Sequence, residues 1–180
     1  MKLLTSILFS ILTHLNTPPM DTASIHQFTV TDIDGKDFDL ASLKGKKVMI
    51  VNVASKCGLT PQYEKLEALY KEFGSQNFVI IGFPANNFLW QEPGTNAEIK
   101  TFCSSKYDVT FPMMSKISVK GSDKHPLYKF LTRKSANGRS DSGVTWNFQK
   151  FLINEDGHLA KVISPRTQPD DPEVIDWLKN

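Results

Sequence analysis

The chain has 180 residues, 40% of them hydrophobic, and 21 basic against 19 acidic residues give a net charge of +2. The length and the hydrophobic content predict one folded domain rather than a disordered chain. The balanced charge argues against a nucleic-acid partner or a charged membrane surface. Two cysteines, Cys57 and Cys103, are too few for a disulfide framework, and with four widely separated histidines they lack the spacing of a structural zinc site.

The first part of the chain differs in composition from the rest. Lys2 precedes a ten-residue run of mainly apolar residues, Leu3 to Leu12, which is too short for a membrane-spanning helix and resembles the hydrophobic region of a signal peptide. No typical cleavage site follows, so Met20 is an alternative start. We therefore expect residues 1–24 to be a signal peptide or a disordered extension ahead of a domain over 25–180. The protein would be exported, to the periplasm or outside the cell, in the first case and cytoplasmic if Met20 is the start.

The first predicted elements are a hairpin and a β-α-β unit. Residues Phe28 to Leu40 show strand patterns on both sides of an Asp34-Gly35 turn, as in a β-hairpin. Apolar runs at 47–51 and 78–82 predict two buried strands, and the helical spacing of apolar residues over 61–74 predicts a helix between them. Two buried strands joined by a helix pair in parallel through a right-handed crossover.

Cys57 lies in the loop between the first of these strands and the helix. Thr60 suits an N-cap and Pro61 suits the first helical turn. Backbone N–H groups and the positive end of the helix dipole are therefore expected near the sulfur, where they favour a thiolate. The neighbouring residues in 55–58 are polar or small, which predicts an exposed loop. Cys57 is thus a candidate nucleophile, although a free cysteine is often only a small core residue.

The remaining patterns complete an α/β fold. The loop 83–94 follows the second buried strand, at the sheet edge where sites of open α/β proteins assemble. A capping box at Thr95 to Glu98 begins a helix that carries Ile99, Phe102 and Cys103 on one face. Further along we expect a short helix over 126–132, a flexible loop over 135–143, an antiparallel hairpin over 148–163 and a last helix capped by 170–172. Together these elements predict a thioredoxin-like fold, with a central mixed sheet flanked by helices and an N-terminal hairpin.

Three segments carry a family resemblance. The segments NVASKCGLTPQY at 52–63, GFPANNFLWQEPG at 82–94 and WNFQKFL at 146–152 resemble the signatures of the glutathione peroxidase family, in the same order. The resemblance implies the fold already predicted and an enzyme that reduces hydrogen peroxide and organic, including lipid, hydroperoxides. Cysteine stands at position 57, where the family often has selenocysteine. We therefore expect the same mechanism with a slower nucleophile, without selenium, metal or another cofactor.

The resemblance also implies a catalytic tetrad of Cys57, Gln91, Trp146 and Asn147. A thiolate alone is insufficient, because lowering its pKa from ~8.5 to ~6 gains only about thirtyfold, whereas enzymes supply about a millionfold or more. Amide and indole N–H donors can stabilise the charge that develops on the departing oxygen. Taken singly, a tryptophan usually belongs to the core and a loop glutamine or asparagine is usually solvated. Only their joint occurrence with Cys57 favours catalytic roles.

Cys103 matches the resolving cysteine of the thioredoxin-dependent members of the family. Some members also have a cysteine after Phe-Pro, but Ala85 occupies that position here. The resemblance implies that a sulfenic acid at Cys57 condenses with Cys103 to a disulfide, which thioredoxin reduces. From its position on an apolar helix face, Cys103 is equally a packing residue, and it could reach Cys57 only by local unwinding. The insertion of tetrameric, glutathione-using members is missing between Phe111 and Pro126, so we expect a monomer without a built glutathione site.

Other functions remain open on the sequence. Glutathione is the alternative reductant, and a redox sensor that passes its disulfide to a partner protein would use the same two cysteines. A thiol–disulfide exchange protein usually has a Cys-x-x-Cys motif, whereas Cys57 is followed by Gly58, Leu59 and Thr60. A cysteine hydrolase would need a histidine base, and no motif places one near Cys57.

Overall fold

Two parallel strands form the centre of the molecule. In the computed structural model, which describes residues 24–180, β3 (Lys47–Val53) and β4 (Phe78–Pro84) pair from Lys47 opposite Phe78 to Val53 opposite Pro84. Helix α1 (Gln62–Phe73) connects them, as the sequence predicts. Every residue of β4 is buried, as is all of β3 except Lys47, because helices or loops cover both faces of these strands.

The sheet is mixed. Its strand order is β4-β3-β5-β6, and β5 (Lys150–Ile153) pairs antiparallel with both β3 and β6 (Leu159–Ile163). A separate two-stranded ribbon of β1 (Thr29–Thr31) and β2 (Asp37–Asp39) confirms the N-terminal hairpin. The other elements are η1 (Ile25–Gln27), η2 (Leu40–Leu43), α2 (Asn96–Tyr107), α3 (Pro126–Leu131), α4 (Lys134–Asn137) and α5 (Pro172–Lys179).

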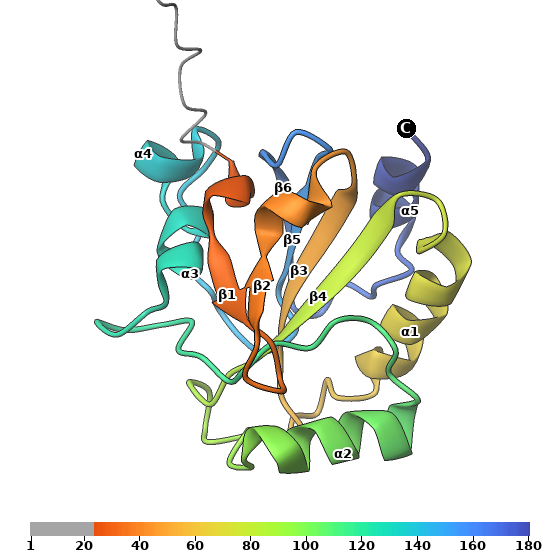
Figure 1. The fold of residues 1–180 in the computed structure, drawn as a ribbon, viewed down its shortest axis with the longest axis vertical. Helices are drawn as coiled ribbons and strands as arrows, with labels where there is room; N and C mark the ends of the chain where they lie inside the picture. The colour runs from red at the N-terminus through yellow and green to blue at the C-terminus, as the bar shows by residue number, and fades with distance from the viewer. Residues whose placement is uncertain (1–23) are drawn as a thin grey trace, which may run out of the picture.

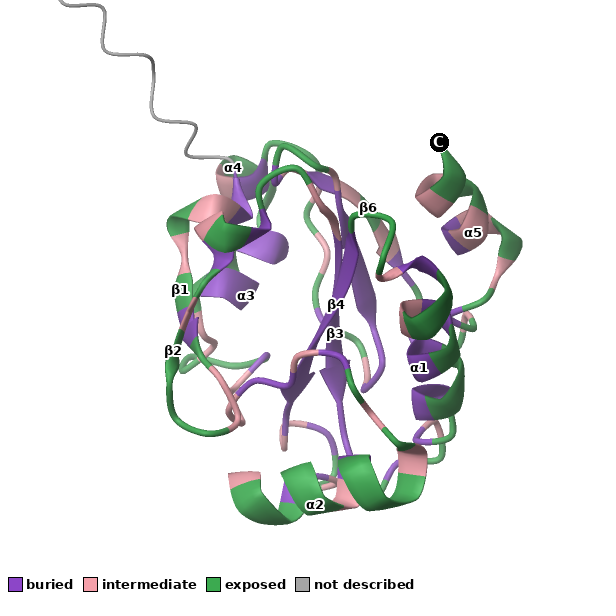
Figure 2. Ribbon diagram, turned by 45° about the vertical axis from the view of Figure 1, so that its right-hand side comes forward, coloured by how far each residue is buried: buried purple, intermediate pink, exposed green. Residues whose placement is uncertain are grey.

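Helices cover both faces of the sheet (Figure 1). Helices α1 and α5 lie on one face, α3, α4 and the β1–β2 ribbon lie on the other, and α2 runs across the end of the sheet where β3 and β4 finish. Side chains alternate along β3: Met49 and Val51 join the core cluster under α1, and Val48 and Ile50 join the cluster on the opposite face. Figure 2 shows the buried strands between the partly exposed helices.

Most predicted elements are confirmed, and three details were wrong. Pro61, not Thr60, is the N-cap residue of α1, and it makes no side-chain capping bond. Part of the loop expected over 135–143 is helix α4, because the buried Asn137 side chain donates to three backbone carbonyls around it. Strand β5 begins at Lys150 rather than at Phe148, because Phe148 has a left-handed φ of 65°.

The N-terminal predictions lie almost wholly outside the described part of the chain, which begins at Ser24. From Ser24 onward, no helix is both long enough and apolar enough to cross a membrane.

Candidate active site

The loop after β3 holds Cys57 in a fixed position. The backbone N–H of Cys57 donates to Thr60 Oγ1 at 3.0 Å, and that hydroxyl donates to the carbonyl of Ala54 at 2.8 Å. The backbone N–H of Leu59 donates to Cys57 Sγ at 3.4 Å. These bonds fold the loop back on itself, so Cys57 is only 8% exposed, and the expectation of an exposed loop is wrong for this residue. The predicted help from backbone donors is present as the Leu59 N–H.

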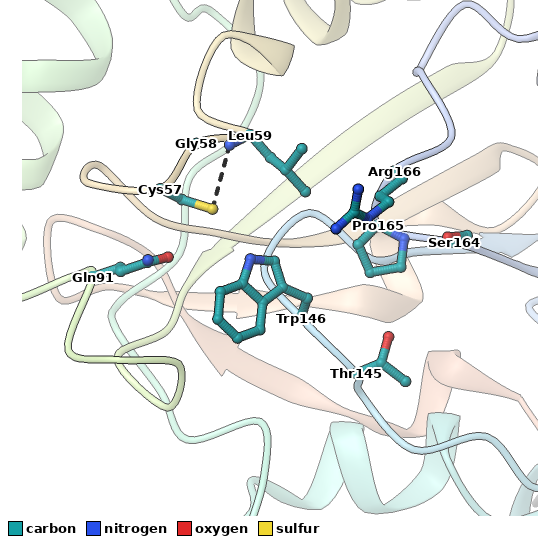
Figure 3. Close-up of a pocket in the computed structure, with 9 residues that line it drawn as sticks. All are labelled: Cys57, Gly58, Leu59, Gln91, Thr145, Trp146, Ser164, Pro165 and Arg166. Atoms are coloured by element: carbon teal, nitrogen blue, oxygen red, sulfur yellow. Dashed lines mark hydrogen bonds between the residues drawn. The ribbon is translucent and has the colours of Figure 1, made fainter.

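The Cys57 sulfur borders a pocket of about 660 Å³. Figure 3 shows the indole nitrogen of Trp146 and the side-chain amide of Gln91 on the same side of the loop as the sulfur. The structure thus brings together three of the four predicted tetrad residues at one cavity. The lining residues are Cys57, Gly58, Leu59, Gln91, Thr145, Trp146, Ser164, Pro165 and Arg166.

Asn147, the fourth predicted residue, lies behind the pocket wall. It is fully buried and does not line the cavity, but its Nδ2 donates to Gln91 Oε1 at 2.9 Å. Because Gln91 Oε1 has this partner, the Gln91 amide N–H groups are left to donate elsewhere. The Gln91 backbone is fixed too, since its carbonyl accepts from the N–H of Lys56 at 2.9 Å.

Trp146 is positioned by contacts on both sides. Asn52, at the end region of β3, donates from Nδ2 to the Trp146 carbonyl at 3.1 Å, and its own carbonyl accepts from the N–H of Phe148 at 2.6 Å. The ring of Phe88 packs against the indole with centroids 5.4 Å apart. The left-handed residue Phe148 separates Trp146 from β5 and directs the chain from the pocket into the strand.

Sequence reasoning missed the far wall of the pocket. Thr145, before β5, and the segment 164–166, after the edge strand β6, line it, but loop residues of this kind carry no distinctive pattern. Lys150 holds this wall in place, because its buried ammonium group donates to the carbonyls of Thr167 at 2.6 Å and Pro165 at 3.3 Å, and to Gln62 Oε1 at 2.5 Å. Burial lowers the pKa of Lys150 to about 7. A lysine at the start of an apolar strand is the sequence signal that could have revealed it.

Cys103 lies outside the pocket, on the buried face of α2. It is 2% exposed and belongs to the same core cluster as Cys57, and both thiols are free. Burial raises the pKa of Cys103 to about 11, the Tyr63 hydroxyl opposes this rise, and the nearby Glu92 carboxylate adds to it. Glu92 is itself buried, which raises the pKa of its carboxyl group. The predicted place of Cys103 on the apolar face is confirmed.

The described range 24–180 contains no group of three or more His, Cys, Asp or Glu side chains that could hold a metal ion. The roles of the tetrad, the resolving role of Cys103 and a site that works without a cofactor stay predictions.

The chain matches known proteins over most of its length. The sequence model described as glutathione peroxidase matches residues 25–132. Thioredoxin/glutathione peroxidase BtuE of Escherichia coli is 43% identical, over 87% of this chain and 96% of the relative. Glutathione peroxidase-like peroxiredoxin HYR1 of Saccharomyces cerevisiae is 47% identical, over 82% and 90%. The crystal structure of Trgpx in apo form aligns with a TM-score of 0.67 and 38% identity, over 87% and 96%.

More distant structures share the architecture alone. A putative thioredoxin from Neisseria meningitidis aligns with a TM-score of 0.59 at 16% identity, which shows the thioredoxin-like fold. The three sequence motifs, the family match over 25–132 and the relatives above 40% identity agree with one another. The chain therefore belongs to the glutathione peroxidase family and is a thiol peroxidase.

Proposed function

We propose that Cys57 is the nucleophile with which this peroxidase reduces hydrogen peroxide and organic, including lipid, hydroperoxides. The observation that carries the proposal is the position of its sulfur at a pocket that Gln91 and Trp146 also line. The Cys57 thiolate attacks the hydroxyl oxygen of the peroxide, a sulfur–oxygen bond forms and the oxygen–oxygen bond breaks. The products are a sulfenic acid on Cys57 and an alkoxide or hydroxide, which takes up a proton and leaves as alcohol or water.

The donors around the pocket have separate roles in the proposal. The indole N–H of Trp146 and the amide N–H of Gln91 stabilise the negative charge on the departing oxygen, and the Leu59 N–H stabilises the thiolate. Asn147 acts through Gln91, because its amide bonds Gln91 Oε1 and does not reach the cavity. We therefore propose that Asn147 is a positioning residue.

The reduction steps use Cys103 and an external dithiol. The Cys103 sulfur attacks the Cys57 sulfenic acid, a disulfide forms and water leaves. Since Cys103 is buried on a helix, α2 unwinds locally before the two sulfur atoms meet. A reduced thioredoxin then restores both thiols. The Escherichia coli relative carries thioredoxin in its name, and the Synechocystis relative, 43% identical, is named a hydroperoxy fatty acid reductase. We propose that the protein works as a monomer without a cofactor.

The test is steady-state reduction of hydrogen peroxide and of a fatty-acid hydroperoxide, with thioredoxin and glutathione supplied separately. We expect turnover with thioredoxin and much slower turnover with glutathione. Turnover with glutathione alone would assign the other reductant. Oxidation of the protein by one equivalent of peroxide, without turnover by either reductant, would support a redox sensor instead.

A further inference from the structure

Two large apolar side chains are exposed beside the Cys57 pocket. Leu89 is 68% and Trp90 is 77% exposed, and they are the only exposed large hydrophobic side chains within residues 24–180. They lie in the connection between β4 and α2, at the end of the sheet where the Cys57 loop also lies (Figure 1). An exposed tryptophan next to an exposed leucine is unusual for a surface that contacts only water.

The backbone presents this pair in an unfavourable conformation. Leu89 and Trp90 have φ angles of 51° and 52°, in the left-handed region that glycine and asparagine adopt more readily. The base of the loop is fixed, since Asn86 Oδ1 accepts from the N–H of Glu92 and Asn87 Oδ1 accepts from the N–H of Val119. The two side chains are therefore held outward, although neither burial nor backbone preference favours these residues there.

Two exposed lysines contact the residues that precede and follow the apolar pair in the chain. Lys120 Nζ lies 5.3 Å from the centroid of the Phe88 ring, and the backbone N–H of Lys56 donates to the Gln91 carbonyl. Both lysines are exposed, and within the described chain neither forms an ion pair with a carboxylate. Glu92 and Glu98 both interact electrostatically with Lys56; the Glu92 side chain is buried and the Glu98 side chain is exposed. Positive charge therefore borders the pair most clearly at Lys120, whereas the charge of Lys56 is partly offset by Glu98.

We propose that Leu89, Trp90, Lys56 and Lys120 form a docking surface for an anionic lipid bilayer. Tryptophan and leucine side chains insert at the membrane interface, where lysine ammonium groups meet anionic headgroups. The balanced net charge does not oppose this, because screening confines electrostatic attraction to charges near the membrane. A protein partner is the weaker alternative, since a stable protein interface needs about 20–30 residues on each side, whereas a bilayer needs only a few protruding apolar groups.

The surface is continuous with the active-site pocket. Gln91, which lines the pocket, follows Trp90 directly, and Phe88, which precedes Leu89, packs against Trp146. A bilayer that holds Leu89 and Trp90 would therefore lie next to the mouth of the Cys57 pocket. If the proposed function holds, docking brings the thiolate to hydroperoxides of membrane lipids. Docking itself does not depend on peroxidase activity, so the two proposals can fail separately.

Binding is tested with reduced protein and no peroxide. Vesicles of equimolar phosphatidylglycerol and phosphatidylcholine are sedimented with wild type and with Leu89→Asn/Trp90→Asn, which keeps a residue that tolerates the left-handed backbone. We expect the vesicle partition coefficient to fall by about tenfold or more when both apolar side chains are lost. Lys56→Gln/Lys120→Gln should also weaken binding, by several fold at low salt and less at high salt. The matched control Lys44→Gln/Lys134→Gln removes the same charge elsewhere and should bind like wild type.

Activity measurements separate docking from damage to the site. Leu89→Asn/Trp90→Asn should keep the wild-type rate with hydrogen peroxide, but reduce hydroperoxides in intact vesicles several fold more slowly. Unchanged vesicle binding in this variant would overturn the proposal. An increased KM for thioredoxin with unchanged vesicle binding would assign the surface to a protein partner and overturn it equally.

Discussion

The two cysteines are both buried, yet the helices beside them differ. Cys57 precedes α1, which buries Gln62, Tyr63, Leu66, Glu67, Leu69 and Phe73. Cys103 lies within α2, which buries only Ile99 and Cys103. Cys57 also faces a pocket and accepts a backbone hydrogen bond, whereas Cys103 has no part in that pocket. Exposure values of 8% and 2% alone would not separate them.

The surroundings of the two thiols differ more than their burial does. The Cys57 loop is fixed by Thr60, Leu59 and the Gln91 carbonyl, as a preorganised site requires. Helix α2 is secured mainly at its ends, by the capping box of Thr95 and Glu98 and by a left-handed C-cap at Asp108. A helix with so few buried residues can open at low free-energy cost. The rigid Cys57 loop suits the attack on peroxide, and the loosely packed helix α2 suits the later step in which Cys103 attacks the sulfenic acid.

The largest effect should come from removing the sulfur of Cys57. We expect Cys57→Ser to abolish peroxide consumption, because no other thiol borders the donor pocket. Stopped-flow measurements of peroxide loss, with circular dichroism as a check on folding, provide the test. Activity above roughly a tenth of wild type would mean that the wrong cysteine has been chosen as the nucleophile.

Removing the other sulfur should stop turnover while sparing the first step. Cys103→Ser should react once with peroxide at the wild-type rate, since the pocket is untouched, and then stall as a sulfenic acid or become over-oxidised. Thioredoxin-driven turnover should be lost. Mass spectrometry of the wild type after one equivalent of peroxide should show a Cys57–Cys103 disulfide, together with a loss of helical signal. Full thioredoxin-dependent activity in Cys103→Ser would reduce Cys103 to a core residue.

Removing a donor at the Cys57 pocket should slow the oxidation of Cys57 and leave disulfide formation with Cys103 unchanged. We expect Gln91→Ala or Trp146→Ala to slow the single-turnover oxidation of Cys57 by about 10²-fold, as for a removed oxyanion-hole donor. Asn147→Ala should slow oxidation less, because in the proposed mechanism Asn147 only orients Gln91 through its hydrogen bond to Oε1. Trp146 also packs against Phe88, so the rate must be measured on protein shown to be folded. Wild-type rates for all three variants would remove the tetrad from the mechanism.

The sequence allowed most of the fold to be predicted because its signals are local. Continuous apolar runs predicted β3 and β4, and the capping box predicted the start of α2. Thr60 was misassigned because its hydroxyl bonds Ala54 and the Cys57 N–H, a tertiary arrangement that a capping pattern does not reveal. The same bonds explain why the polar Cys57 loop is less exposed than its composition suggested.

The site was predicted through family motifs rather than through local physics. Motifs place Gln91 and Trp146 near Cys57, and the structure places all three at one pocket. They do not indicate that Asn147 lies outside the pocket lining and donates to Gln91, since that depends on a contact between residues 56 positions apart. The wall around Arg166 could not be predicted, because Lys150 positions it from a strand through backbone carbonyls.

Lys150 offers a way to test how rigidly the wall of the Cys57 pocket is held. A folded-state pKa of about 7, against ~10.4 in the unfolded chain, means that the unfolded chain binds one more proton between these values. The free energy of unfolding should therefore rise with pH across this window, by about 1–2 kcal/mol between about pH 7.5 and pH 9. Urea unfolding of Lys150→Met should lack this rise and show lower stability throughout, because three acceptors lose their donor.

The exposed Lys161, which pairs with Glu173 on the surface, is the matched control. Lys161→Met should keep the pH dependence of the wild type. Lys150→Met should also slow the oxidation of Cys57 more than the formation of the disulfide, because the wall that it loosens belongs to the pocket. Equal effects on both steps would show that the Cys57 pocket and helix α2 do not respond independently.

The smallest expected effect concerns the buried Tyr63 hydroxyl, which favours the Cys103 thiolate and so opposes the rise in the pKa of Cys103. Tyr63→Phe should therefore raise the pKa of Cys103 beyond about 11, by less than about one unit, because the thiolate loses a nearby polar group that favours it. The carbon-13 shift of Cys103 Cβ, followed during a pH titration of the reduced protein, measures this directly. Tyr128→Phe makes the same change at an equally buried hydroxyl in the core on the opposite face of the sheet, and should leave the titration unchanged. A Cys103 midpoint near ~8.5 in the wild type, the value of a free cysteine, would contradict the effect of burial on this thiol. A raised midpoint that only Tyr63→Phe moves would show that Cys103 is kept protonated until α2 opens.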